Sequence, residues 1–189
     1  GKEIIEIIKE AGIVGMGGAG FPTHVKYMPK DPSAIDYIIV NCAECEPYLT
    51  SDYRRMMEEP EKIVGGLQAA MKIFDGRAKG VLAVEDNKKD AAAKLREAAK
   101  GIPDIEVVEL KTKYPQGAER QLIFAVTGRK INSSMLPADA GCVVNNCDTI
   151  SFFEVEVRTI ERYVSENLEE ISANGYEIIK GKRLKDFLN

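Results

Sequence analysis

Four glycines fall within the six residues Gly15-Met16-Gly17-Gly18-Ala19-Gly20, and Phe21-Pro22-Thr23 follows them directly. A backbone without Cβ atoms can bring its N–H groups close to a ligand, and a proline at this place is typical of the first turn of a helix. Because helix N-termini favour negative charge, the segment predicts a phosphate-binding loop. The alternative is a flexible glycine run that only ends the preceding helix.

The residues before the loop argue against the usual dinucleotide-binding fingerprint, which requires a strand at that place. Ile4, Ile5, Ile8 and Ala11 repeat with the spacing of an amphipathic helix, and Gly12 ends it. We therefore expect the loop to join one helix to another.

The rest of the chain alternates strand and helix patterns. Short apolar runs predict strands at 37–40, 80–84, 105–110 and 142–144. Helical patterns begin at Ser51-Asp52, where these residues form a cap, and at Pro60, Lys88, Gly117 and Thr149. The strand, helix and strand between 80 and 110 form a βαβ unit, so the chain predicts an α/β fold with a parallel sheet.

Composition limits the class of protein. The 189 residues, 44% of them hydrophobic, suit one α/β domain over 1–165, and we expect 166–189 to begin a truncated following domain. With 26 basic and 30 acidic side chains and no run of like charge, no nucleic-acid partner is expected. The sequence shows neither a signal peptide nor an apolar stretch of about 18 residues, so we expect a cytoplasmic chain without direct membrane insertion.

Cysteine usage is ambiguous. Cys42, Cys45, Cys142 and Cys147 have irregular spacing, and the chain has a single histidine. Free thiols are the favoured interpretation, and a metal or iron–sulfur site is the alternative.

Polar side chains follow two of the expected strands. Asn41 to Glu46 and Asn145-Asn146 lie where ligands bind in open parallel sheets, and amide groups suit the polar edge of a ring system. Together with the glycine loop they suggest a phosphorylated heterocycle, although each residue can equally be a turn former or a solvated charge. No nucleophile or acid–base set is evident, and hydride transfer with a cofactor needs none.

Three ordered segments, Gly15 to Lys26, Asn41 to Tyr48 and Val144 to Asn146, resemble the FMN-binding 51-kDa-type subunit of respiratory complex I. They resemble more closely the C subunit of the Rnf electron-transport complex and related clostridial proteins. The resemblance implies a Rossmann-like α/β domain with a parallel sheet flanked by helices, which holds FMN and accepts hydride from NADH. It also implies an iron–sulfur domain or subunit as electron acceptor, in a complex at the inner face of a membrane.

The resemblance further implies roles for individual residues. Lys26 would meet a phosphate or ribose, Phe21 would stack near the dinucleotide, and Glu119 matches the second of two adjacent glutamates beside the flavin. No catalytic side chain or metal ligand is implied. The implied cofactor-binding residues are Gly15, Gly17, Gly18, Gly20, Phe21, Lys26, Asn41, Glu44, Glu46, Glu119, Val144, Asn145 and Asn146.

The sequence departs from the family pattern at several places, and the change at position 16 leaves a second hypothesis open. Met16 stands where the complex I subunit has arginine, Ala118 replaces the first glutamate, and no cluster-binding cysteine motif follows. The leading prediction is a flavodomain that takes hydride from NADH and passes electrons to iron–sulfur centres elsewhere. The alternative is a non-catalytic docking module of the same fold that has lost its cofactor.

Overall fold

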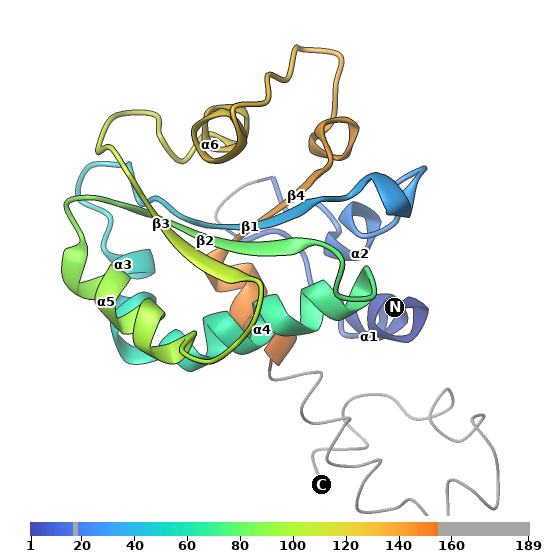
Figure 1. The fold of residues 1–189 in the computed structure, drawn as a ribbon, viewed down its shortest axis with the longest axis horizontal. Coiled ribbons are helices and arrows are strands. Elements are labelled where there is room, and N and C mark those ends of the chain that lie inside the picture. Colours follow the sequence, from blue (N-terminus) through green and yellow to red (C-terminus); the bar gives the residue numbers. More distant parts are fainter. Residues whose placement is uncertain (17–18, 155–189) are drawn as a thin grey trace, which may run out of the picture.

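The computed structural model describes residues 1–16 and 19–154, and four parallel strands form its single sheet in the order β3-β2-β1-β4 (Figure 1). Each strand expected from an apolar run lies within an observed one, which confirms the predicted parallel α/β fold. The strands are β1 (Tyr37–Cys42), β2 (Lys79–Glu85), β3 (Ile105–Leu110) and β4 (Cys142–Asn146).

Helices cover both faces of the sheet (Figure 1). One face carries α1, α3, α4, α5 and a helix at 147–154, and the other carries α6 and a short 3-10 turn, η2. None of these helices, in the part of the chain described, is long and apolar enough to cross a membrane. The bounds are α1 (Lys2–Glu10), α2 (Thr23–Lys26), η1 (Pro32–Ala34), α3 (Ser51–Glu58), α4 (Pro60–Ile73), α5 (Lys89–Ala98), α6 (Glu119–Thr127) and η2 (Pro137–Ala140).

The two cores follow from the alternation of side chains along each strand. Ile38 and Val40 of β1 face the larger core, under α4 and α5, whereas Ile39 faces the smaller core beside Leu122 of α6. Because both faces are covered, the central strands read as continuous apolar runs rather than alternating ones. This is why the strands can be located from the sequence.

Two adjacent glycines let α4 approach the helix at 147–154 closely. A Cβ on Gly66 would lie 1.8 Å from the carbonyl oxygen of Ile150, whereas a Cβ on Gly65 would meet the Glu154 side chain at 2.4 Å. The first obstacle is backbone and the second is a flexible side chain. Gly66 therefore sets the spacing between α4 and the helix that follows β4.

Two local expectations are corrected. The helix expected after the glycine loop is a single turn, α2, and the N–H of its first residue, Thr23, is already donated to the Ile13 carbonyl at 3.1 Å. This N–H is therefore taken up within the chain, and the phosphate-binding role of the glycine loop stays a prediction. Helix α3 begins as expected at Ser51, but it has no side-chain cap from Thr50, Ser51 or Asp52.

The expected boundary at 165 and the extension at 166–189 lie outside the described residues.

Candidate functional site

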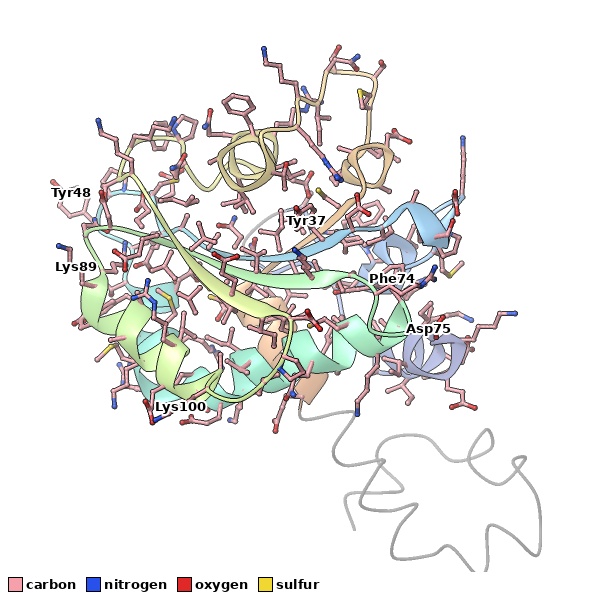
Figure 2. The ribbon with its side chains drawn as sticks, in the orientation of Figure 1. Tyr37, Tyr48, Phe74, Asp75, Lys89 and Lys100 are labelled. Carbon is pink, nitrogen blue, oxygen red and sulfur yellow. The ribbon has the colours of Figure 1, made fainter. Side chains whose placement is uncertain are left out.

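The carboxyl ends of the strands form the edge at which the predicted site residues gather. In Figure 2, Tyr48 and Lys89 mark the end of the molecule where β1 and β2 finish, and Phe74 and Asp75 mark the opposite end. Strand β4 runs parallel to β1 with Asn146 opposite Asn41. Open parallel sheets bind ligands beyond this edge.

The glycine loop is fastened to the end of β4 through Met16. Its N–H is donated to the hydroxyl oxygen of Thr149 at 2.9 Å, and its carbonyl accepts the side-chain amide of Asn146 at 2.5 Å. The loop also closes on itself, because the N–H of Gly15 is donated to the Phe21 carbonyl at 2.8 Å. These contacts fix both sides of the loop, and Gly17 and Gly18 lie outside the described residues.

The end of the loop, at Gly20 and Phe21, leaves an aromatic side chain exposed. Gly20 adopts a left-handed backbone with φ of 66°, which favours glycine there. The Phe21 ring that follows is 49% exposed, so it is available to stack on a planar ligand.

Lys26 projects from α2 toward the end of β4. Its ammonium group donates to the Val144 carbonyl at 2.9 Å. Burial lowers the pKa of Lys26, and the nearby carboxylate of Glu119, the first residue of α6, opposes that shift by favouring the charged amine. The predicted residues Lys26, Val144 and Glu119 therefore lie around one point at which α2, β4 and α6 meet.

Asn41 links the loop after β1 to the loop before α6. Its side chain donates to the Gly117 carbonyl at 2.8 Å and accepts the Ala43 N–H at 3.1 Å. The Gly117 N–H is directed at the sulfur of Cys45 at 3.3 Å, and a Cβ on Gly117 would lie 2.5 Å from the Ala43 carbonyl. The loop before α6 is thus packed tightly against the loop after β1.

Glu44 is one of two predicted residues that have a buried acceptor atom without a hydrogen bond. One carboxylate oxygen accepts the Asp52 N–H at 2.8 Å, so Glu44 supplies the contact at the start of α3 that no side-chain cap provides. Its other oxygen is buried and has no hydrogen-bond partner in the described part of the chain. Glu46, two residues further on, is exposed.

Asn145 points away from the other predicted residues. Its amide donates to the Tyr27 hydroxyl at 2.5 Å inside the larger core, where the Tyr27 ring packs on Phe74 and Phe153. Burial raises the pKa of Tyr27, so this hydroxyl stays neutral. Adjacent strand residues face opposite sides of a sheet, which separates Asn145 from Asn146. The amide oxygen of Asn145 is buried without a hydrogen bond to any described residue.

Sequence reasoning missed Thr149 and Lys88 as site residues. Thr149 contacts Met16 across 133 positions of sequence, and the Lys88 ammonium donates to the Glu44 carbonyl across 44 positions. No local pattern marks either residue, because each contact arises only when the strand ends are brought together.

Two of the four cysteines have neighbouring thiols. Cys42 and Cys147 are fully buried at the neighbouring ends of β1 and β4, and the contact between their thiols, with burial, raises the pKa of Cys147. Cys147, Asp52 and Asp148 place their ligand atoms within 4.8 Å of one another. Burial and the neighbouring Asp148 carboxylate raise the pKa of Asp52 to about 6. The expectation that these thiols bind no metal remains a prediction.

Comparison with known proteins identifies the family to which the chain belongs. The family described as the Nuo51 FMN-binding domain matches residues 8–154. Since that match covers most of the 189 residues, the chain belongs to the Nuo51 FMN-binding domain family. The predicted resemblance is confirmed.

The relatives sharpen the assignment within that class. The C subunit of the proton-translocating ferredoxin:NAD(+) oxidoreductase complex of Clostridium ljungdahlii is 52% identical over 148 residues, covering 78% of this chain and 32% of the relative. The C subunit of the Na(+)-translocating ferredoxin:NAD(+) oxidoreductase complex of Acetobacterium woodii is 52% identical over 146 residues, covering 77% and 33%. The chain therefore spans about a third of each relative.

A solved structure shares the fold. An NAD+-reducing [NiFe]-hydrogenase in the H2-reduced state superposes with a TM-score of 0.71 at 26% identity, covering 82% of this chain and 30% of that one. The similarity confirms the expected type of α/β domain.

Proposed function

We propose that this chain is the flavin-binding part of an electron-transfer oxidoreductase. It holds FMN at the carboxyl edge of the sheet and accepts hydride from NADH, and the electrons then pass to iron–sulfur centres elsewhere in a larger assembly. Membership of an FMN-binding family and the similarity to subunits of ferredoxin:NAD(+) oxidoreductase complexes support the proposal.

The observation that carries the proposal is the attachment of the glycine loop at Met16 to Asn146 and Thr149. It brings a loop with little side-chain bulk to the strand edge where Lys26 supplies positive charge. An ammonium group has three N–H donors, and Val144 accepts one of them, which leaves donors for a phosphate.

The groups at this edge fit FMN. The buried oxygen of Glu44 that has no hydrogen-bond partner can accept an N–H or O–H group, and the exposed Phe21 ring can stack on a flat ring system. FMN, when bound, supplies the exchange of hydride with a nicotinamide and of single electrons with iron–sulfur centres. The protein's own contribution is to bind and orient the cofactor.

A titration of FMN, in which binding is measured by the quenching of flavin fluorescence, tests this function. We expect the chain to bind FMN in a 1:1 ratio, and we expect Thr149→Val to weaken binding at least tenfold because it removes the acceptor of the Met16 N–H. Ser151→Ala is the matched control, since this buried hydroxyl lies on the same helix and donates only to the Asp148 carbonyl.

The docking-module alternative makes the opposite prediction. Met16 in place of arginine removes one positive charge from the loop, and a folded chain that stays colourless at saturating FMN would favour this second function. Met16→Arg is then the variant to examine first.

A further inference from the structure

Lys88 is a mostly buried cation at the candidate site, and its contact with the Glu44 carbonyl is only one of its interactions. It lies three residues after the end of β2 and is the N-cap residue of α5. Its side chain is 13% exposed, and its ammonium nitrogen lies 3.1 Å from the Glu44 carbonyl oxygen, 3.9 Å from the Glu44 carboxylate and 3.6 Å from the Glu85 carboxylate. One ammonium group thus joins the ends of β1 and β2.

Helix stability does not explain a lysine at this position. A positive charge near a helix N-terminus opposes the helix dipole, so α5 gains nothing from it. The two carboxylates do explain it, because the side chains of Glu44 and Glu85 are only 2% and 1% exposed. A buried carboxylate is stable only when it is paired or well hydrogen-bonded.

The three groups hold the loop after β1 in one geometry. Glu85 also accepts the Lys113 N–H at 3.3 Å, and Glu44 accepts the Asp52 N–H at 2.8 Å, so each carboxylate keeps one oxygen on backbone. Lys88 then fixes the carbonyl and the carboxylate of Glu44 from the same side. With two carboxylates and one ammonium, the cluster carries a net charge of −1.

The geometry points to Lys88 as a positioning residue of the flavin site. It holds Glu44 so that the buried oxygen without a hydrogen bond keeps its place, and it limits the negative charge near a cofactor that becomes more negative on reduction. This inference rests on the proposed function. Removing the ammonium group changes the charge of the cluster from −1 to −2 and releases the Glu44 carbonyl.

Three variants of the 189-residue chain test the role, each compared with the wild type for FMN dissociation constant and midpoint potential. Lys88→Met keeps the length and removes the charge, Lys88→Arg keeps the charge, and Lys89→Met changes the exposed neighbouring lysine as a control. We expect Lys88→Met to weaken FMN binding at least tenfold, Lys88→Arg to stay within threefold of the wild type, and Lys89→Met to have no effect.

The midpoint potential separates an electrostatic role from a general loss of structure. We expect Lys88→Met to weaken binding of reduced FMN tenfold more than binding of oxidised FMN, which lowers the two-electron potential by about 30 mV. If Lys88→Met does not fold, the double variant Glu85→Gln/Lys88→Met restores the net charge of −1. We expect this double variant to fold and still to bind FMN at least tenfold more weakly than the wild type.

Either of the following results would overturn the role of Lys88 without touching the proposed function: wild-type affinity and potential in folded Lys88→Met, or wild-type affinity in the double variant. Equal losses in all three single variants would also overturn it, because the effect would not depend on this charge. Absence of FMN binding by the wild-type chain is a different outcome, since it contradicts the proposed function itself.

Discussion

The close approach of α4 to the helix at 147–154 predicts that Gly66→Ala destabilises the protein whereas Gly65→Ala does not. The added Cβ at Gly66 would lie 1.8 Å from the Ile150 carbonyl oxygen, and real contacts of this kind essentially never fall below 3.0 Å. The helices must therefore separate by at least 3.0 − 1.8 = 1.2 Å. At Gly65 the obstacle is the Glu154 side chain at 2.4 Å, which can rotate away.

Two opposing contributions determine how much Gly66→Ala changes the free energy of unfolding. Overpacking of this size costs about 1–3 kcal/mol, and alanine in place of glycine within a helix returns about 1 kcal/mol. Because the obstacle at Gly66 is backbone, we take the upper part of the first range and expect a net loss of about 2 kcal/mol in the free energy of unfolding. This corresponds to a fall in melting temperature of roughly 4–8 °C for a chain of this size. Gly65→Ala should be neutral or slightly stabilising.

Urea and thermal unfolding followed by circular dichroism measure both variants. The same displacement moves Thr149, which fastens the glycine loop, so Gly66→Ala should also weaken FMN binding at temperatures at which it remains folded. Equal stability of the two variants, or a more stable Gly66→Ala protein, would show that the helices do not pack as described.

Three further predictions concern buried polar groups. The pKa of the Asp52 carboxyl is raised from 3.8 to about 6, so this group favours folding below about pH 4, and that contribution is lost as the pH rises through 6. Asp52→Asn should therefore raise the free energy of unfolding by about 1–2 kcal/mol at pH 7.5, after allowance for partial exposure. At pH 4 the substitution should leave the free energy of unfolding unchanged. Tyr27→Phe should lower the free energy of unfolding by about 1–3 kcal/mol because it removes the hydrogen-bond partner of the Asn145 amide. Tyr53→Phe, at an exposed hydroxyl, is the control and should change the free energy of unfolding by less than about 0.5 kcal/mol. Urea unfolding measures both variants. Elemental analysis of anaerobically purified protein should find no stoichiometric zinc or iron, and a tightly held ion whose removal unfolds the chain would contradict the prediction that the four cysteines bind no metal.

Burial on both faces makes the sheet predictable from the sequence, because Ile38, Ile39 and Val40 must all be apolar when helices cover both sides. The helix after the glycine loop is shorter than its starting pattern predicts. Pro29 disfavours helical geometry in the residue before it, which limits α2 to the single turn ending at Lys26. The start of a helix is therefore a poor guide to its length unless the next proline is considered with it.

The sequence predicts which strand ends form the candidate site, but it does not predict the contacts within that site. Asn41, Glu44 and Asn146 can be found because polar residues after apolar strands mark the ligand-binding edge of a parallel sheet. The residues that contact the glycine loop and Glu44 cannot be found in this way. The contacts of Thr149 with Met16 and of Lys88 with Glu44 join segments that lie far apart in the chain. The residue types alone contain no information on these pairings.

Anaerobic addition of NADH to the FMN-loaded chain tests the central claim most directly. If the chain is the hydride-accepting flavodomain, one equivalent of NADH should bleach the visible absorbance of bound FMN in a single stoichiometric step, without sustained turnover when a ferredoxin is added. An unchanged spectrum at saturating FMN and excess NADH would contradict the claim.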